Sequence, residues 1–460
     1  MKKYLIYVLA AFAALAFTVP GCKTSNPDDQ EQQIDPKDVK ALKVEIVTAG
    51  DRIFDSKPTF TVKINNPNDF KCAEKLRLLV FKDIKSEAVQ EASEEREIEV
   101  PKKGLEVQIT TKTDLAPGFY KASIFVGNIH QRVSFGISPF EIVSAPDYQA
   151  DFNEFWEATK DQLKAIDMNA QLTEITAKSS AARKIYLVEM NSIPDGLTGE
   201  PVVVRGYYAE PQDGKKHPVI MHYFGYDDQN PTSKAYCPAG GSSSDYAEFW
   251  LSTRGQVVNN RTADKREPDG KGDFVNTYGD WFAFNFGQRD AYYYRGAFMD
   301  CIQGVRFMAT RETSDMNNLF AEGSSQGGAF SYAAASLSDY PFTAISPCVA
   351  FLGDFPDYFQ IVGWPANTAK ENQGSMTDAE MYAFLSYFDT KNLATRIPAS
   401  TAVLACSGLQ DGTCPPHTNI APFNNLTTTD KEYYFYPEMG HSIPSDWTTK
   451  MWTFFKARIK

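Results

Sequence analysis

The feature that most constrains the fold is a change in hydrophobic pattern near residue 145. From residue 39 to 144, short segments alternate apolar and polar residues or run in β-branched and aromatic residues, separated by Pro, Gly, Asn or Asp. After it, an amphipathic helix predicted at 147–166 is followed by continuous apolar runs such as "PVIMHYFG" and "TAVLACSGL", which alternate with helical segments. The two patterns belong to different architectures, so we expect a multidomain chain.

The first pattern predicts an all-β domain over 39–144. It contains about seven short strands in about 105 residues, a density typical of an immunoglobulin-like sandwich. Tyr120 stands where such folds often carry a corner tyrosine, although ordinary packing of a tyrosine entering a strand is the alternative. We find no catalytic pattern in this part.

The second pattern predicts an α/β domain over 145–460. Its short, continuously apolar runs suit strands that are buried on both faces. Strands that alternate with helices form a mostly parallel sheet. No internal repeat interrupts the segment, so one α/β domain is expected.

The N-terminus predicts export and a lipid anchor. Lys2 and Lys3 precede an apolar run that is short for a membrane span, and "VPGC" follows it. That ending resembles a bacterial lipobox, which implies removal of residues 1–21 and lipid attachment to Cys22. An ordinary secretory signal is the alternative. Residues 22–38 then read as a flexible polar tether, and the outer membrane, cell surface or periplasm is the expected location.

Charge and cysteine usage narrow the function classes. A formal net charge of −12 would repel a nucleic-acid backbone, so we expect no nucleic-acid partner. Six cysteines remain after Cys22, spread along the chain without a C-x-x-C pair. This spacing indicates neither a zinc site nor a disulfide framework.

The stretch "EGSSQGGAFSY" at 322–332 predicts a serine nucleophile. Ser325 lies between glycines, after a strand-like segment and before a helix rich in small residues. Strand, sharp turn and helix are the context of a nucleophile elbow, in which the helix N-terminus also favours a developing oxyanion. A small residue in a glycine-rich turn is the alternative reading.

A serine hydroxyl needs a base that is held by an acid. In α/β-hydrolases the acid follows the serine and the histidine comes last, which leaves only His417 and His441 as bases. We prefer His441, in a loop after an aromatic strand, and interpret His417, flanked by prolines, as an exposed loop residue. Asp411 ends a predicted strand and is the expected acid, with a turn-forming role before Gly412 as the alternative.

An oxyanion hole needs two donors beside the nucleophile. The backbone N–H of Gln326 follows the serine directly, and the loop in "VIMHYFGYDD" could supply the N–H of Tyr226. Packing of the Tyr226 ring alone is the other interpretation.

Several stretches, in order, resemble the acetyl xylan esterase / cephalosporin-C deacetylase family of α/β-hydrolases. The resemblance covers about 145–460. It departs from the family pattern at Phe224-Gly225 and at His441-Ser442. The matching stretches are "DFNEFW" (151–156), "FGYDD" (224–228), "RGQ" (254–256), "RDAYYYRGAFMD" (289–300), "GSSQGG" (323–328), "GLQDGTCPP" (408–416) and "GH" (440–441).

The resemblance implies a serine carbohydrate esterase that removes acetyl groups without a metal or cofactor. It implies Ser325, Asp411 and His441 as the triad and Tyr226 and Gln326 as oxyanion donors. It further implies that the signature Arg254, Gly255 and Gln256 braces the loops around the site. The expected partner is an acetylated oligo- or polysaccharide, and a homo-oligomer stays open.

Two rival functions remain at this point. One is another hydrolase on the same fold, such as a serine peptidase or an esterase for bulkier acyl groups. The other is a catalytically inert glycan-binding lipoprotein. The presence of Ser325, Asp411 and His441 together argues against the second.

Overall fold

The computed structural model describes residues 39–48, 50–196, 199–228, 234–235, 245–258 and 278–460. The predicted signal peptide, the tether and the lipid-attachment site Cys22 lie outside the described residues. Within these ranges, no helix is both long enough and apolar enough to cross a membrane.

The N-terminal part is all β. It consists of a three-stranded sheet in the order β1-β3-β6 and a five-stranded sheet in the order β2-β8-β7-β4-β5. The strands are β1 (Lys43–Val47), β2 (Ile53–Phe54), β3 (Thr59–Asn65), β4 (Cys72–Lys82), β5 (Glu94–Val100), β6 (Leu105–Thr110), β7 (Gly118–Val126) and β8 (Ile129–Ile137), with 3₁₀ turns η2 (Ile84–Ser86), η3 (Gln90–Ala92) and η4 (Pro139–Glu141).

The alternating pattern of β7 shows why this part folds as sheets. Ala122 and Ile124 are fully buried in the core of the β-domain, whereas the side chain of Lys121, next to Ala122 in the strand, is exposed. The Tyr120 hydroxyl donates a 2.8 Å hydrogen bond to the Ala116 carbonyl, a contact typical of a tyrosine corner. The immunoglobulin-like assignment itself stays a prediction.

The second part is built on a nine-stranded sheet in the order β19-β18-β17-β16-β12-β14-β11-β10-β9. Pairing is parallel from β14 to β19 and antiparallel from β14 to β9. The strands are β9 (Gln171–Glu174), β10 (Arg183–Ser192), β11 (Val202–Pro211), β12 (His217–Tyr223), β14 (Ala247–Ser252), β16 (Ser314–Ser324), β17 (Ala344–Cys348), β18 (Ala402–Gly408) and β19 (Lys431–Tyr436), and β13 (Lys234–Ala235) pairs with β15 (Val257–Val258) beside it.

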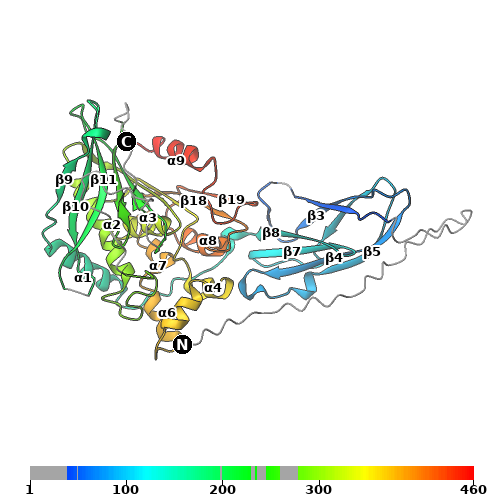
Figure 1. Ribbon diagram of the computed structural model, residues 1–460. Helices are drawn as coiled ribbons and strands as arrows, with labels where there is room; N and C mark the ends of the chain where they lie inside the picture. Colours follow the sequence, from blue (N-terminus) through cyan, green and yellow to red (C-terminus); the bar gives the residue numbers. More distant parts are fainter. Residues whose placement is uncertain (1–38, 49, 197–198, 229–233, 236–244, 259–277) are drawn as a thin grey trace, which may run out of the picture.

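Helices cover both faces of this sheet (Figure 1). Helices α2 and α3 pack on one face against β12 and β16, and α9 packs on the other through Trp447 and Phe455. The helices are α1 (Phe152–Ala165), α2 (Tyr293–Ala309), α3 (Gln326–Leu337), α4 (Phe355–Ile361), α5 (Ala366–Asn372), α6 (Asp378–Leu385), α7 (Thr390–Ala394), α8 (Pro416–Asn424) and α9 (Trp447–Lys456), with the 3₁₀ turn η5 (Thr176–Lys178). An all-β part followed by a mostly parallel α/β-hydrolase domain confirms the predicted fold class.

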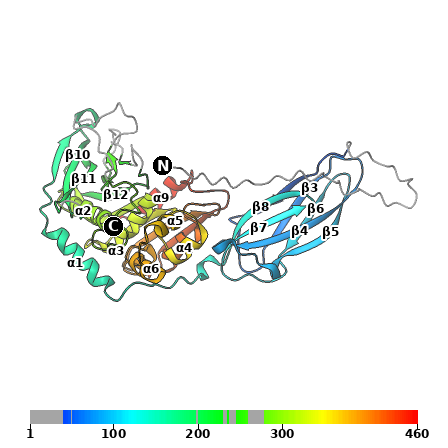
Figure 2. The ribbon, with the colours of Figure 1, turned by 60° about the horizontal axis from the view of Figure 1, so that its bottom comes forward.

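The two domains lie end to end and contact each other at one end of the β-domain (Figures 1 and 2). Phe119 of β7 lies 6.0 Å from Phe435 of β19, measured between ring centroids, and belongs to the core of the hydrolase domain. The Asn424 side chain of α8 donates hydrogen bonds of 3.0 Å to the carbonyls of Pro139 and Ile142. Residues of β7 and β8 thus line a cavity together with the loop that follows β18.

Candidate active site

Ser325 occupies a sharp turn between β16 and α3. Its φ of 58° and ψ of −121° are costly for a residue with a side chain and are the mark of a nucleophile elbow. A Cβ atom on Gly323 would lie 2.4 Å from the Gly327 carbonyl oxygen, and one on Gly327 would lie 2.4 Å from the Tyr223 carbonyl oxygen. The glycines around Ser325 are therefore required by close backbone contacts.

The structure brings Ser325, His441 and Asp411 into one hydrogen-bonded line. The Nε2 atom of His441 lies 2.9 Å from Ser325 Oγ, and its Nδ1 atom lies 2.8 Å from Asp411 Oδ2. The other carboxylate oxygen of Asp411 accepts hydrogen bonds of 2.8 Å from the backbone N–H groups of Thr413 and Cys414. These bonds fix the carboxylate and leave one oxygen for the imidazole.

The three side chains come from the same edge of the sheet. Ser325 follows β16, Asp411 follows β18 and His441 follows β19, and all three strands are parallel. In open α/β sheets this carboxyl edge is where catalytic groups collect. The Asp411 side chain is fully buried, whereas 27% of the His441 side chain is exposed, so a substrate can reach the imidazole.

The predicted oxyanion donors also adjoin Ser325. Gln326 is the first residue of α3, and a Cβ atom on Gly225 would lie 3.9 Å from the Cβ atom of Ser325. The loop of Gly225 and Tyr226 thus lies against the elbow. The Tyr226 hydroxyl donates a 2.8 Å hydrogen bond to Asp280, which fixes the orientation of the Tyr226 side chain.

An aromatic wall, formed by Tyr226, Phe351 and Trp364, stands beside the elbow. The Tyr226 ring centroid lies 5.1 Å from that of Trp364 and 6.1 Å from that of Phe351, and the last two rings stack at 5.2 Å. The Phe351 backbone N–H donates to the Ser325 carbonyl at 3.0 Å. The sequence analysis missed Phe351, although its position just after β17 at the same sheet edge is a signal that could have found it.

The signature at 254–256 contacts the loops around the site. The Gln256 side-chain amide donates to the carbonyls of Phe224 and Gly225 at 3.3 and 3.0 Å. The Arg254 guanidinium is buried and pairs with the Asp300 carboxylate at 2.7 and 2.9 Å. Gly255 between them has a φ of 80°, a conformation that favours glycine.

His417 does not lie where the sequence analysis expected it. It is buried on helix α8, with 4% of its surface exposed, so its interpretation as an exposed loop residue is wrong. Pro415 and Pro416 start that helix, because a missing N–H costs nothing in a first helical turn. Its Nε2 atom lies 3.2 Å from Asp354 and 3.1 Å from Asp357, so in the described part of the chain the histidine contacts two carboxylates and no serine hydroxyl.

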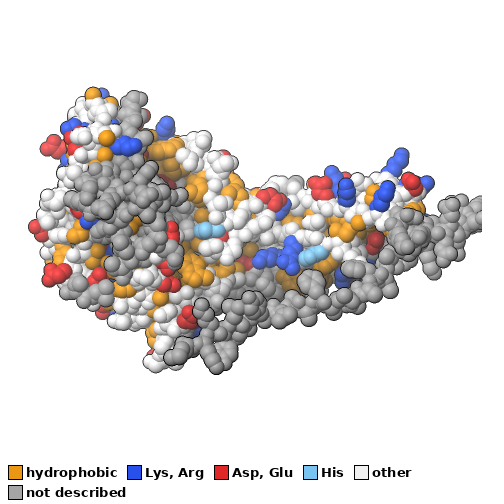
Figure 3. Space-filling view, in the orientation of Figure 1, with side chains coloured by type: hydrophobic (Ala, Val, Ile, Leu, Met, Phe, Trp, Pro, Cys, Tyr) orange, Lys and Arg blue, Asp and Glu red, His pale blue; other side chains and the backbone are white. Residues whose placement is uncertain are grey.

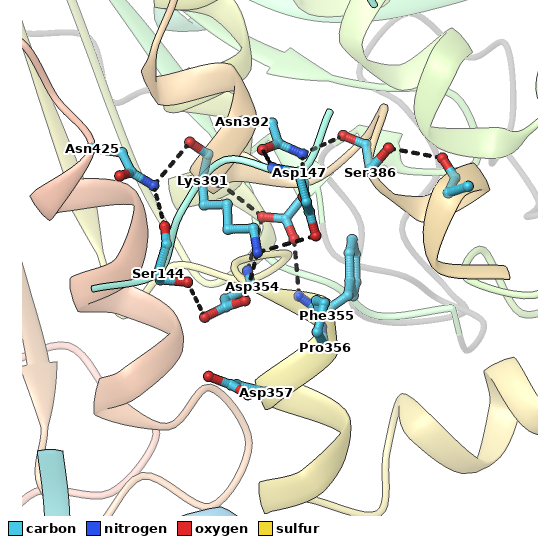
Figure 4. Close-up of polar contacts among 12 residues, drawn as sticks. Ser144, Asp147, Asp354, Phe355, Pro356, Asp357, Ser386, Lys391, Asn392 and Asn425 are labelled. Atoms are coloured by element: carbon cyan, nitrogen blue, oxygen red, sulfur yellow. Dashed lines mark hydrogen bonds and ion pairs between the residues drawn. The ribbon is translucent and has the colours of Figure 1, made fainter. Parts of the chain in front are cut away.

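A buried ion-pair network surrounds Asp354 (Figure 4). The Lys391 ammonium lies 2.8 Å from Asp354 and 3.2 Å from Asp147, and the Ser144 hydroxyl donates to Asp354. Burial alone would lower the pKa of His417, but the hydrogen bonds to Asp354 and Asp357 raise it to about 10. Burial would likewise raise the pKa of Asp354, yet His417 and Lys391 lower it to about 2.

The same cluster is the one group of candidate metal ligands among the described residues. One ligand atom from each of Asp354, Asp357 and His417 lies within 4.8 Å of the others. Lys391 already neutralises Asp354, and the contacts of His417 stabilise its protonated form, which cannot bind a metal. The arrangement is that of an ion-pair network, and the absence of a metal cofactor stays a prediction.

The match to a protein family decides the identity of the hydrolase domain. The model of the family described as "Acetyl xylan esterase (AXE1)" matches residues 142–458. The chain belongs to the acetyl xylan esterase family. It is therefore a carboxylic ester hydrolase, as the sequence predicts.

Individual relatives agree with this assignment. An acetyl xylan esterase from Paenibacillus sp. R4 superimposes with a TM-score of 0.56 at 26% identity, over 70% of this chain and 98% of that one. Acetyl xylan esterase 1 from Thermoanaerobacterium sp. shares the fold with the same TM-score at 21% identity, over 70% of this chain and 98% of that one. The acetyl esterase Axe7A from Xylanibacter ruminicola is 24% identical over 364 residues, which are 75% of each chain.

Proposed function

We propose that this member of the acetyl xylan esterase family is a serine esterase that removes acetyl groups from acetylated xylan or a similar carbohydrate. Ser325 is the nucleophile, His441 the general base and Asp411 the acid that orients it. The observation that carries the proposal is the hydrogen-bonded line from Ser325 Oγ through His441 to Asp411, placed at an elbow of strained backbone. The relatives named as acetyl esterases support the choice of acyl group.

Acylation starts with attack of the Ser325 oxygen on the acetyl carbonyl carbon. His441 accepts the hydroxyl proton at Nε2, and Asp411 stabilises the resulting imidazolium through Nδ1. The tetrahedral intermediate collapses as His441 gives that proton to the departing sugar oxygen. A covalent acetyl-serine and a free sugar hydroxyl result.

Deacylation repeats the steps with water. His441 takes a proton from water, the hydroxide oxygen attacks the acetyl-serine, and Ser325 leaves with the proton returned to its oxygen. The N–H groups of Gln326 and Tyr226 donate to the oxyanion in both halves, and one such donor is worth about 3 to 4 kcal/mol in the transition state. Acetate is the product.

The aromatic wall of Tyr226, Phe351 and Trp364 favours a small acyl group. These rings pack edge to face or stacked beside the elbow, and Phe351 is fixed to Ser325 through the backbone. A methyl group fits against such a wall, whereas a peptide or a long acyl chain would require the rings to move. This argument favours an acetyl esterase over a peptidase.

Gln256 braces the oxyanion loop through its contacts with Phe224 and Gly225, and the bonds of Arg254 to Asp300 hold the segment that carries Gln256. An exported protein anchored through Cys22, with an immunoglobulin-like domain between anchor and esterase, would hold the active site near a membrane surface. Homo-oligomer formation is left open.

Acetate release from acetylated xylan by the full chain tests the proposal. We expect release by the parent protein and none above background by Ser325→Ala, with Ser445→Ala, an exposed serine outside the site, as the matched control. Turnover of a peptide anilide but not of the acetylated polymer would replace the esterase with a peptidase. Activity of Ser325→Ala within tenfold of the parent would remove Ser325 from the mechanism.

A further inference from the structure

The outer face of the five-stranded sheet in the β-domain carries a cationic and aromatic strip. We define the strip as Arg77 of β4, Lys121 and Phe125 of β7, and His130 and Arg132 of β8, all of which alternate with core residues. The rings of Phe125 and His130 stack with centroids 4.4 Å apart and planes 6° apart. The Arg77 guanidinium lies 4.6 Å from the Phe125 ring centroid.

The basic side chains of the strip form no ion pair with another described residue. Among the described residues, no carboxylate oxygen lies within 4.0 Å of the charged groups of Lys121 or Arg132, both of which are exposed. Elsewhere in the same domain, Lys75 pairs with Glu95 at 2.8 Å and Lys71 with Glu99 at 3.1 Å. Basic groups without an ion-pair partner attract an anion, although the chain as a whole carries a net charge of −12.

The strip leads into a cavity between the two domains. The cavity has a volume of about 250 Å³ and receives Lys121, Arg132 and Ser134 from β7 and β8. Its opposite wall is the loop Gln410, Asp411 and Gly412, which carries the proposed catalytic acid. The volume lies just below the range of about 300 to 1,000 Å³ that holds drug-sized ligands, so it suits a single sugar ring.

Asp83, a buried carboxylate, also lines this cavity. Asp83 lines the cavity with 9% of its surface exposed, and its Oδ2 atom has no hydrogen-bond partner in the described part of the chain. Its other oxygen accepts from the backbone N–H of Ile84 at 2.8 Å.

The strip and the esterase site open on the same side of the molecule. In Figure 3, lysine and arginine side chains and a histidine gather over β7 and β8, and a histidine of the hydrolase domain is visible on the same face. His130 and His441 are the exposed histidines among the described residues. A chain molecule lying along this face could contact both domains at once.

We propose that the strip and the cavity bind a carboxylate-bearing sugar of the same polysaccharide chain whose acetyl ester lies at Ser325. This inference rests on the proposed esterase function. Arg132 and Lys121 pair with the uronic-acid carboxylate, and the flat stack of Phe125 and His130 contacts the face of a further ring. The β-domain thereby selects acetylated polymers that are acidic.

Binding is tested with the full chain carrying Ser325→Ala, so that no ester is consumed. The probes are glucuronoxylan without acetyl groups and the same polymer after chemical reduction of its carboxylates. We expect at least tenfold tighter binding of the acidic polymer in calorimetry, and loss of this preference in Lys121→Ala/Arg132→Ala. A matched control, Lys102→Ala/Lys103→Ala, removes two lysines at the turn after β5 and should keep the preference. Equal affinity for both polymers, or an unchanged preference in the first double variant, overturns the proposal.

Catalysis supplies a second readout in the active chain. We expect Lys121→Ala/Arg132→Ala to lower the ratio of kcat/KM for acetylated glucuronoxylan to that for 4-nitrophenyl acetate about tenfold at low salt, and less at 0.5 M NaCl because charges are screened. An unchanged ratio contradicts the proposal. If the parent hydrolyses neither substrate, the esterase function fails, while the binding result with the two polymers still decides whether the strip recognises carboxylates.

Discussion

Of the three aspartate–histidine pairs in the described part of the hydrolase domain, two involve histidines that follow β18 and β19, and only one of these two faces a nucleophile. His441 contacts Asp411 through Nδ1 and Ser325 through Nε2, and it is open to solvent. His417 is buried, contacts Asp354 and Asp357 through a single nitrogen, and its Nδ1 atom has no hydrogen-bond partner among the described residues. An aspartate–histidine contact alone therefore does not identify a catalytic base. A catalytic base is identified by a nucleophile at the second imidazole nitrogen and by access for the substrate.

The largest loss of activity is expected when His441 is replaced. Without the imidazole, nothing accepts the Ser325 proton, so His441→Ala should lower kcat for 4-nitrophenyl acetate by up to about 10⁶. His417→Ala is the matched control and should leave kcat within tenfold of the parent. A collapse of kcat in the control together with an active His441→Ala would exchange the roles of the two histidines.

A smaller loss is expected from the acid of the first pair. Asp411→Asn keeps the shape of the side chain but presents an N–H where the imidazole Nδ1 needs an acceptor, which mis-sets the tautomer. We expect kcat to fall by about 10⁴, or about 5.4 kcal/mol. Steady-state kinetics at pH 7 to 8 measure this change. A rate within a factor of ten of the parent would point to another carboxylate.

The second pair should matter for stability instead. His417→Ala leaves Asp354 and Asp357 without their imidazolium partner and should lower the free energy of unfolding by about 3 kcal/mol. The pKa of His417 is raised to about 10, so its contribution is complete below about pH 6.5 and is lost as the pH rises through 10. Denaturant unfolding of both proteins at pH 6.5 and pH 10 checks the sign. A difference that grows toward pH 10 would contradict the charged form of His417.

The smallest effect concerns the support of the oxyanion loop. Tyr226→Phe removes the hydroxyl that donates to Asp280 but keeps the backbone N–H that is proposed to face the oxyanion. Loss of one such bond should cost about 1 kcal/mol, which appears as a decrease in kcat of less than tenfold. A thousandfold decrease would show that the hydroxyl itself takes part in the chemistry.

The pair of Asp411 and His441 could be predicted from the sequence because several short-range sequence features indicate the same residues. The glycines around Ser325 mark the elbow, and the chain order of acid and histidine leaves few candidates. Asp411 and His441 both follow predicted strands, and parallel strands bring their carboxyl ends together. The alternation of strands and helices likewise predicted the fold class that the structure shows.

The second pair could not be predicted, because it depends on contacts between distant segments. His417 is buried only because α8 packs beside α4 and because Asp354 and Lys391 arrive from elsewhere in the chain. The hydrophobic periodicity of a helix or strand predicts which of its faces is buried. It does not predict which charged groups from other segments contact that face. The cavity between the domains escaped prediction for the same reason, since β7 and the loop after β18 are far apart in sequence.

Covalent labelling tests the central claim most directly. The full chain is treated with a fluorophosphonate, and the modified residue is located by mass spectrometry of the digested protein. The account predicts a single adduct on Ser325, formed with loss of esterase activity and strongly slowed in His441→Ala but not in His417→Ala. Loss of activity with an adduct on another serine, or labelling of Ser325 at the parental rate in His441→Ala, would contradict it.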